Sequence, residues 1–394
     1  MDKKKSTELA IETILTRGVE EIIDREHLTE RLKNGRPLRV KLGIDPTSPN
    51  IHLGRSIPLL KLKDFQDLGH QVVLIIGNFT GLIGDTSDKD SERPMLAEEQ
   101  VKRNLQSYVA QAAKIIDINR AEIHYNGDWL EELKYLDIGF QANQFSLNEF
   151  ISRDNIKRRL EAGKRVSLRE LLYPLMQGYD SVKVKADVEL GGSDQRFNLL
   201  AGRDLQRAYG QEPQDIITGP LIEGLDGRKM SSSYGNTVNL TDAPEEMYGK
   251  IMSLQDELII KYFRLTTRVD LVTIKGYEQD LAQGLNPREL KMKLAFELTK
   301  TYHSAPQAEA AQAYFIKTIS NKETPDELEE FTPSDYKLIE VLVEAGLANS
   351  KSEARRLLSQ GGVKVNNEVV ADLDFQMTSG DVLQKGKLKF LKIS

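Results

Sequence analysis

Hydrophobic residues in the first part of the chain alternate between short continuous runs and helical spacing. Residues 38–44 form a largely apolar run that leads into turn residues at 45–47, a pattern that predicts a strand followed by a loop. Apolar residues then recur near helical spacing over 53–68, and the apolar run 71–77 predicts a second, fully buried strand. This succession predicts a strand–helix–strand unit with parallel strands.

The same alternation returns further along the chain. Short strand-like runs lie at 122–126, 188–191 and 215–218, and helical patterns separate them. We therefore expect an α/β fold with a Rossmann-like, doubly wound parallel sheet in a first domain that spans 1–243. Ligands bind beyond the carboxyl ends of the strands in such sheets, so functional residues should directly follow the apolar runs.

Three further regions differ from this first domain. The pattern over 244–319 is helical throughout, and 320–335 holds Pro, Thr and several acidic residues, which predicts a linker. Residues 336–394 hold nine Lys and Arg against seven Asp and Glu, a net charge of +2. Because the whole chain carries −6, the preceding residues carry −8. Any basic surface that binds nucleic acid should therefore be local.

Composition narrows the class of protein. A length of 394 residues predicts two or three domains, and 39% hydrophobic with 29% charged residues is typical of a folded globular chain. The sequence has no cysteine and five scattered histidines, so we expect neither disulfides nor a dedicated metal site. No apolar run reaches the roughly 20 residues that span a bilayer, and the charged start is not typical of a secretory signal. A cytoplasmic protein is the expectation.

The loop 45–55 combines two residues suited to nucleotide binding. His52 and Gly54 lie at the predicted start of the helix over 53–68, where backbone N–H groups attract phosphate. An imidazole there can donate a hydrogen bond to a phosphate oxygen, and Gly54 would let a flat base lie against the backbone. Taken alone, this pattern is also typical of an ordinary helix start.

The loop 224–233 combines glycines, one lysine at Lys229 and three serines. A mobile loop of this chemistry can close over a triphosphate and stabilise negative charge as the leaving group departs. As an isolated string it fits a solvated surface loop equally well.

Tyr173, Gln177 and Asp180 have the spacing i, i+4 and i+7, which places them within about 60° of arc on one face of a helix. They can converge on one ligand, although such a trio is more often made of ordinary packing or solvated positions. Ser167 and the acid three residues later form a capping-box pattern for the start of that helix. Pro174 implies either a kink or a later start.

The two loops together carry a family signature. His52-x-Gly54 and the run from Lys229 through Ser233 are the two signatures of class I aminoacyl-tRNA synthetases. With the segments 43–54, 81–85 and 191–195, nearly the whole chain closely resembles tyrosyl-tRNA synthetases. The resemblance implies a ligase that activates tyrosine with ATP, brought in with Mg²⁺, and then transfers tyrosine to its tRNA.

The resemblance also implies roles on the ATP side. His52, Thr47 and Lys229 would contact the phosphates, and Arg55 occupies the place where the family usually has a second histidine. Lys89 and Arg93 are weaker phosphate candidates. The nucleotide-binding residues implied by the motifs are Gly43, Asp45, Gly54, Asp194, Lys229, Met230, Ser231, Ser232 and Ser233.

On the amino-acid side, Asp180 would accept a hydrogen bond from the phenol hydroxyl, and phenylalanine would leave this carboxylate unpaired. Asp85, Tyr173 and Gln177 would surround the α-ammonium group. Two further residues are assigned to the tyrosine site: Gln195 near the substrate carboxylate, and Lys41, which lies where some members have a tyrosine.

The C-terminal region resembles the small S-four RNA-binding domain over 336–394. A capped, basic helix and the strand after it supply the expected RNA-binding residues Lys351, Arg355, Arg356 and Lys364. The family further implies a homodimer, with its contact in an insertion at about 130–166.

Two alternative functions stay open at this point. A tryptophanyl-tRNA synthetase shares the fold and the activation chemistry but ordinarily lacks the C-terminal domain and the Tyr173, Gln177, Asp180 pattern. A non-catalytic RNA-binding protein on a synthetase scaffold is the other, and the intact His52 and Lys229 argue against it.

Overall fold

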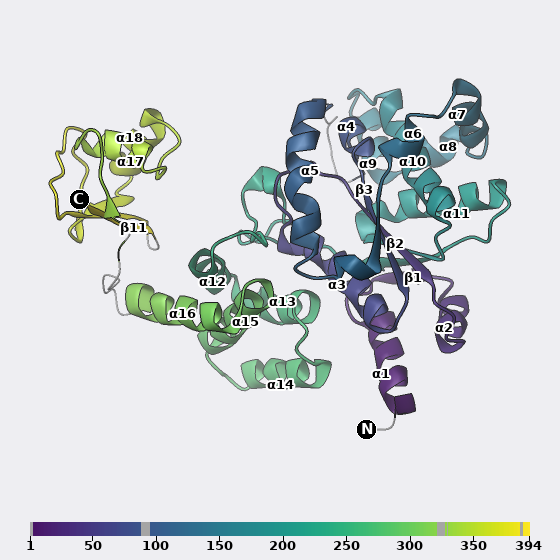
Figure 1. Ribbon diagram of the computed structural model, residues 1–394, viewed down its shortest axis with the longest axis horizontal. Helices are drawn as coiled ribbons and strands as arrows, with labels where there is room; N and C mark the ends of the chain where they lie inside the picture. Colours follow the sequence, from purple (N-terminus) through teal and green to yellow (C-terminus); the bar gives the residue numbers. More distant parts are fainter. Residues whose placement is uncertain (1–2, 88–94, 321–327, 329, 387–388) are drawn as a thin grey trace. The chain divides into compact units, whose positions relative to one another are not determined.

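The computed structural model describes residues 3–87, 95–320, 328, 330–386 and 389–394 (Figure 1). The chain divides into two compact units. The first comprises 1–241 and 254–290, and the second comprises 242–253 and 291–394.

A six-stranded sheet forms the centre of the first unit, in the order β1-β6-β5-β2-β3-β4. Five of its strands run parallel, and β1 pairs antiparallel with β6 at one edge. The doubly wound parallel sheet expected from the sequence is confirmed, with one short antiparallel strand added. The strands are β1 (Glu21–Ile23), β2 (Arg39–Ile44), β3 (Gln71–Ile76), β4 (Ala121–Tyr125), β5 (Val188–Gly192) and β6 (Asp215–Gly219).

The central strands are apolar because both faces of the sheet are covered. Residues 72–76 of β3 are at most 1% exposed. Helix α3 (Leu53–Asp67) packs on β2, β3 and β5, and it ends at Leu68 before Gly69, whose φ of 89° suits glycine. The helix therefore begins directly after the loop that carries His52, at the carboxyl end of β2.

Helix α10 (Leu168–Val184) begins where the capping box predicts. The Ser167 side chain accepts a hydrogen bond from the backbone of Arg169, and the Glu170 carboxylate accepts one from the Ser167 N–H at 2.9 Å. Pro174 lies inside the helix without ending it, so a later start is excluded. Helix α11 (Arg196–Ala208) packs closely along α10, since Gly178 of α10 approaches the backbone of Ala201.

The other helices of the stretch before residue 243 include a group between β4 and α10. They are α1 (Lys3–Thr16), α2 (Arg25–Lys33), α4 (Thr80–Ile83), α5 (Glu98–Ala112), α6 (Gly127–Leu130), α7 (Tyr135–Ala142), α8 (Leu147–Ile151) and α9 (Asp154–Glu161). The stretch predicted to be helical holds α12 (Pro244–Met252), α13 (Ile259–Thr266), α14 (Leu271–Ala282), α15 (Pro287–Tyr302) and α16 (Ala305–Phe315).

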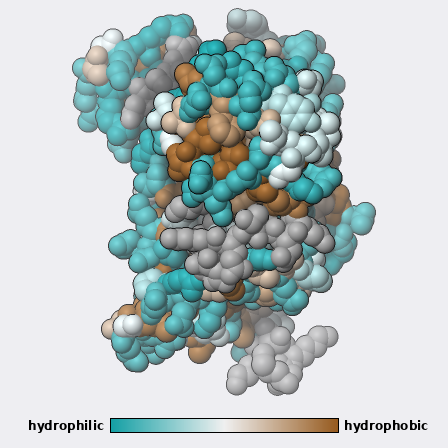
Figure 2. Space-filling view, turned by 90° about the vertical axis from the view of Figure 1, so that its left-hand side faces the viewer, coloured by the Kyte–Doolittle hydropathy of each residue, from teal (hydrophilic) through white to brown (hydrophobic). Residues whose placement is uncertain are grey.

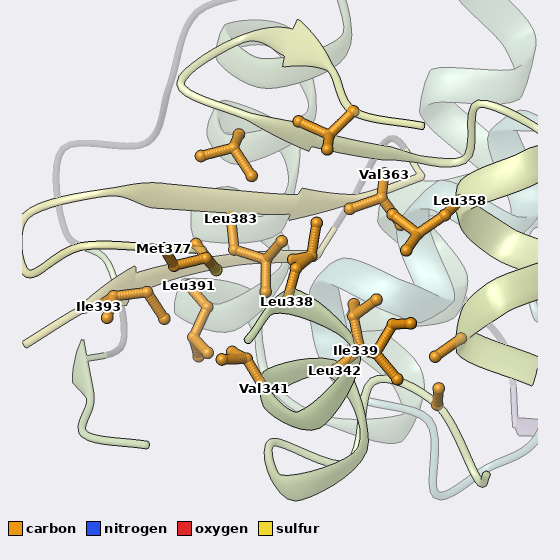
Figure 3. Packing of buried hydrophobic residues seen from close by; sticks show 14 residues of the cluster. Leu338, Ile339, Val341, Leu342, Leu358, Val363, Met377, Leu383, Leu391 and Ile393 are labelled. Carbon is orange, nitrogen blue, oxygen red and sulfur yellow. The ribbon is translucent and has the colours of Figure 1, made fainter. Parts of the chain in front are cut away.

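The C-terminal region is a small α+β fold around its own apolar core (Figure 3). Its sheet has the order β7-β11-β10-β8-β9, with β7 (Glu330–Phe331), β8 (Val363–Val365), β9 (Glu368–Val369), β10 (Val382–Lys385) and β11 (Lys389–Ile393). The side chains of helices α17 (Leu338–Glu344) and α18 (Lys351–Ser359) meet those of the strands in this core, and Leu338, Leu358 and Leu383 are fully buried. Strand β7 lies in the segment predicted as a linker, where it pairs with β11.

Within the described residues, no helix is long and apolar enough to cross a membrane. The face drawn in Figure 2 is mostly hydrophilic, with hydrophobic residues gathered in limited patches.

Candidate active site

A pocket of about 300 Å³ opens at the carboxyl ends of the central strands, where the sheet topology predicts a ligand. Most of the residues selected from the sequence line it together. They are Gly43, Asp45, Thr47, His52, Gly54, Arg55, Asp85, Tyr173, Gln177, Asp180, Asp194, Gln195, Lys229, Met230, Ser231, Ser232 and Ser233.

His52 caps the start of α3 and is 7% exposed. Burial, with the cations of Arg55 and Lys229 nearby, lowers the pKa of His52 to about 3, so its ring is neutral. Its Nδ1 atom is buried and has no hydrogen-bond partner among the residues that the structure describes. A β-carbon on Gly54 would lie 3.1 Å from the imidazole, so glycine is what lets this ring fold over the helix start.

The two signature loops meet at the pocket. The Gly54 N–H donates to Sδ of Met230 at 3.3 Å, and the hydroxyls of Ser232 and Ser48 lie 3.4 Å apart. Lys229 donates from Nζ to Oδ2 of Asp194 at 2.9 Å, and its side chain is 34% exposed. The imidazole and the amine expected at the phosphates therefore face one space.

Arg55 organises the loop before α3. Its guanidinium donates to the Thr47 hydroxyl at 2.8 Å, to the Tyr108 hydroxyl at 2.8 Å and to the Asp45 carbonyl at 3.3 Å. Asp45 in turn accepts hydrogen bonds from the hydroxyls of Thr80 at 2.7 Å and of Tyr173 at 2.8 Å. Burial raises the pKa of Asp45 to about 6, and the two hydroxyls oppose that rise.

Asp180 lies at the closed end of the pocket and is 3% exposed. The indole N–H of Trp129 donates to its Oδ1 at 2.8 Å, and the Asn126 amide donates to its Oδ2 at 3.1 Å. Burial raises the pKa of Asp180 to about 7, and the nearby Lys41 cation opposes the rise. The carboxylate is thus held in one orientation by two donors.

Asp85 and Gln195 come together although 110 positions separate them. The Gln195 amide donates to Oδ2 of Asp85 at 2.5 Å and to the Ser87 hydroxyl at 2.8 Å, while its own oxygen accepts from Asn198 at 2.8 Å. Asp85 also accepts from the Ser87 backbone at 3.0 Å. Both side chains border the same pocket as Tyr173.

Lys41 does not line the pocket, in contrast to its assignment from the sequence. Its side chain is fully buried and forms an ion pair with Glu189 at 2.9 Å. The reason is the position of Lys41 three residues before the end of β2, where its side chain is covered by α10 through Gln177 and Ser181. Only the last residues of the strand reach the open edge.

Sequence reasoning missed the two donors to Asp180. Asn126 directly follows β4, so the rule that functional residues follow the strands would have selected it. Trp129 is the one tryptophan of the chain, but its contact depends on how α6 turns back over the sheet, and no spacing reveals that.

Lys89 and Arg93 lie outside the described residues. In the C-terminal region, Arg355 and Arg356 are exposed on α18, and Lys351 at the start of that helix pairs with Glu340 at 2.7 Å. Lys364 is half-buried on β8.

Comparisons with known proteins agree with this geometry. The family model for tRNA synthetases class I (W and Y) matches residues 33–320, and the S4 domain model matches residues 337–383. Relatives include Tyrosine--tRNA ligase of Thermotoga maritima, 48% identical over 97% of this chain and 96% of that protein. Tyrosine--tRNA ligase of Carboxydothermus hydrogenoformans is 45% identical over 96% of each.

Solved structures support the fold. Tyrosyl-tRNA synthetase from Archaeoglobus fulgidus, complexed with L-tyrosine, has a TM-score of 0.62 at 22% identity, over 78% of this chain and 99% of that one. A C-terminally truncated mitochondrial tyrosyl-tRNA synthetase from Aspergillus nidulans has a TM-score of 0.65 at 20% identity, over 79% and 98%.

The fold, the pocket and the matching family model define the class, that of the class I aminoacyl-tRNA synthetases. Within that class the chain belongs to the tyrosyl-tRNA synthetase family, of the bacterial type, because its curated relatives match nearly its whole length. This confirms the resemblance, the ligase activity and the three-part fold expected from the sequence. The tryptophanyl and non-catalytic alternatives are not favoured.

Proposed function

We propose that this pocket is the active site of the aminoacyl-tRNA ligase, where tyrosine is activated with ATP before it passes to the terminal ribose of its tRNA. Family membership sets the reaction, with ATP as a substrate. One observation carries the assignment to this pocket. His52 and Lys229, from loops far apart in the sequence, border the same space as the Asp180 carboxylate.

In this proposal the closed end of the pocket binds the phenol group. The Asp180 carboxylate, oriented by Trp129 and Asn126, accepts a hydrogen bond from the tyrosine hydroxyl. Phenylalanine lacks that hydroxyl, so it would leave a buried carboxylate short of one partner, at a cost of about 1–3 kcal/mol or more. The only hydrogen-bond donor of the tryptophan side chain is its indole N–H, and this larger side chain would have to displace Trp129 and Asn126.

The α-ammonium group of tyrosine has three partners in this proposal: Asp85, Tyr173 and Gln177. The Tyr173 hydroxyl donates to Asp45, so its oxygen lone pairs are left to accept from the ammonium. Gln195, which donates to Asp85, lies beside the substrate carboxylate. That carboxylate would then point toward the signature loops.

At the open end the tyrosine carboxylate attacks the α-phosphorus of ATP. A bond forms between the carboxylate oxygen and phosphorus, the bond to the bridging oxygen breaks, and pyrophosphate leaves with that oxygen. No protein nucleophile takes part, so catalysis comes from positioning and charge stabilisation. Neutral His52 donates a hydrogen bond to a phosphate oxygen, and Thr47 and Lys229 bind the departing charge.

ATP binding separates the present pair of Lys229 and Asp194 in this scheme. Asp194 accepts from the ribose hydroxyls, and the ammonium of Lys229 turns to the phosphates. Gly43, Gly54 and the segment Met230–Ser233 border the nucleotide. Mg²⁺ comes bound to the phosphates, since it keeps several waters and needs few protein ligands. Among the residues with described positions, no group of three His, Asp or Glu could hold a metal ion.

Amino-acid-dependent exchange of labelled pyrophosphate into ATP tests the activation step. We expect exchange with tyrosine and no exchange with tryptophan or phenylalanine. Exchange with tryptophan would instead support a tryptophanyl enzyme. Absence of exchange with every amino acid would refute the catalytic assignment of the pocket.

We assign RNA binding to the C-terminal domain at 336–394, after a linker at 320–335 and a helical domain at 244–319 on the anticodon side of the tRNA. The first domain, 1–243, carries the pocket. Lys351, Arg355, Arg356 and Lys364 contact the phosphate backbone, and the match to the S4 domain supports this assignment.

The double variant Arg355→Gln/Arg356→Gln tests this RNA-binding role. The KM for tRNA should rise, and its dependence on salt should become shallower, because each lost phosphate contact lowers the salt slope by roughly 0.7–0.9. Tyrosine-dependent pyrophosphate exchange should stay unchanged. Lys392→Gln, which changes a lysine paired with Glu330 in the same domain, is the matched control. An unchanged KM for tRNA in the double variant would contradict the role.

We also propose a homodimer whose contact lies at about 130–166. Helices α7 and α8 of this segment expose Tyr135 (95%), Leu136 (84%) and Leu147 (62%), a density of apolar side chains that marks interaction sites. Gel filtration with light scattering should give about twice the chain mass of 44.5 kDa. Tyr135→Asp/Leu136→Asp should give one chain mass. A monomeric unmodified protein would refute the dimer.

We also propose a cytoplasmic location, which fits an enzyme that acts on tRNA and in which no described helix could cross a membrane. Fractionation of the source cells checks this location.

A further inference from the structure

A buried ion pair lies directly behind the pocket. Lys41 of β2 and Glu189 of β5 are Cα partners on neighbouring parallel strands, and both side chains are 0% exposed. Their charged atoms, Nζ and Oε1, are 2.9 Å apart. The site proposed for tyrosine uses neither residue.

Every polar atom of this pair is engaged. Lys41 Nζ also donates to the backbone carbonyl of Gln177 at 2.9 Å and to the Ser181 hydroxyl at 2.7 Å. Glu189 also accepts from the Gln177 amide at 3.1 Å, from the Ser181 hydroxyl at 3.0 Å and from Gln214. The pair therefore holds Gln177 twice, by its backbone and by its side chain.

Helix α11 leaves room for this network. A β-carbon on Gly202 would lie 2.5 Å from the Gln214 amide, 3.1 Å from the Ser181 hydroxyl and 3.3 Å from Glu189. Glycine at this helical position has an ordinary φ, so space and not backbone conformation is the reason for it. Side chains from β2, β5, α10 and the residue before β6 thus converge on one point.

The chemistry of the pair fixes the orientation of the Gln177 amide. An ionised carboxylate only accepts hydrogen bonds, so Gln177 must present its NH₂ group to Glu189. The side-chain carbonyl oxygen of Gln177 is then the atom that can accept a hydrogen bond from a ligand in the pocket, which Gln177 lines. A neutral partner at position 189 could both donate and accept, and the amide could then turn over.

We propose that Lys41 and Glu189 act as a positioning pair that holds Gln177 with its side-chain carbonyl oxygen toward the α-ammonium of the amino acid. This inference rests on the proposed function, since it deepens the role of Gln177 in the tyrosine site. A buried ion pair is seldom more stable than well-packed apolar residues of the same volume. Its presence beside a substrate site fits a role in orientation.

The double variant Lys41→Met/Glu189→Gln tests the pair without leaving a buried charge unpaired. Single variants would leave one charge alone and would be strongly destabilised. In the double variant the dissociation constant of tyrosine should rise roughly tenfold, because one hydrogen bond to a charged group is lost. The KM for ATP should stay unchanged.

A deaminated analogue separates positioning from general loosening. Hydroxyphenylpropionate keeps the phenol and the carboxylate but lacks the ammonium. At about pH 8.5, where Asp180 stays mostly ionised although the Lys41 cation is gone, its inhibition constant in pyrophosphate exchange should be equal in the double variant and the unmodified enzyme. Equal losses for tyrosine and for the analogue would overturn the proposal, and so would an unchanged tyrosine affinity.

Two further measurements keep the outcome clear. Arg39→Met/Glu122→Gln removes an ion pair from the same strand β2, two residues earlier and outside the pocket, and should leave tyrosine binding unchanged. Tyrosine-dependent exchange by the unmodified enzyme tests the proposed function separately. If that exchange occurs and the double variant binds tyrosine normally, the positioning role alone is refuted.

Discussion

The two ends of the pocket are built differently. At the closed end, Asp180 is 3% exposed, and side chains from a helix and a strand end hold both of its oxygens. At the open end, Lys229 is 34% exposed and belongs to a loop of glycines and serines, in which contacts between loops replace packing. One end is a fixed acceptor and the other a set of adjustable donors.

This difference matches the two tasks of the reaction. An amino acid is distinguished from its analogues by a partner that cannot move to accept the wrong one. A triphosphate whose charge shifts during the reaction needs donors placed where the charge accumulates, and such donors can sit on a loop that closes. Changes at the open end should therefore alter rate, and changes at the closed end should alter tyrosine affinity.

Lys229→Met should have the largest effect. Loss of one donor to the developing negative charge should lower kcat for pyrophosphate exchange by about 10²–10³. The dissociation constant of tyrosine, measured by equilibrium dialysis, should stay the same. Lys63→Met, which changes a half-buried lysine of α3 that pairs with Asp67 and does not line the pocket, is the control and should keep full activity. A loss of tyrosine affinity as large as the loss of rate would break the distinction between the two ends.

Asp180→Asn should have the next largest effect, and on affinity. The new side chain would turn its NH₂ group toward Trp129 or Asn126, both of which are donors, and would offer the phenol a neutral amide oxygen in place of a carboxylate, so the hydrogen bond from tyrosine is weakened. The cost of about 2 kcal/mol corresponds to roughly a 30-fold rise in the dissociation constant of tyrosine. The KM for ATP should not change. If phenylalanine binding fell by the same factor, the variant would have damaged the pocket and not the phenol site.

The central strands could be predicted because burial on both faces leaves a continuous apolar run. The runs 38–44 and 71–77 correspond to β2 (Arg39–Ile44) and β3 (Gln71–Ile76) within one residue at each end. Strand β1 (Glu21–Ile23) was not predicted, since three residues carry no periodicity and their pairing with β6 decides the conformation.

The candidate site, like the strands, could be predicted only in part. The signature loops could be found because their residue types and their order along the chain can be read directly from the sequence. The environment of Lys41 could not, because its partner Glu189 is a cross-strand neighbour, and sheet register is not visible from spacing. Trp129 was missed for a similar reason, since its contact with Asp180 depends on the fold of α6.

Asn236→Ala sharpens the comparison at the open end. The buried Asn236 amide donates to Asp226 at 2.7 Å and to the Lys229 carbonyl at 3.1 Å, and it accepts from the Ser231 backbone at 2.9 Å. Without these bonds the loop would occupy its present position less often. We expect kcat for exchange to fall roughly tenfold, about the cost of one or two hydrogen bonds, with tyrosine affinity unchanged. A change in tyrosine affinity without a change in kcat would contradict this assignment.

The pH dependence of tyrosine binding should give the smallest effect. The pKa of Asp180 is raised to about 7, and the ionised form is the better acceptor for the phenol, so affinity should fall as the pH drops below 7. Between pH 8 and pH 6.5 the ionised fraction falls, and the apparent dissociation constant should rise roughly fourfold. The pKa of Asp45, about 6, keeps that group mostly ionised over this range.

Tyrosine binding near pH 6.5 should also release protons, because the ligand favours the ionised carboxylate. Calorimetry in two buffers of different ionisation enthalpy measures that release, and Asp180→Asn should abolish it. Proton uptake in place of release would mean that the phenol binds a protonated Asp180, and the closed end would then be a donor.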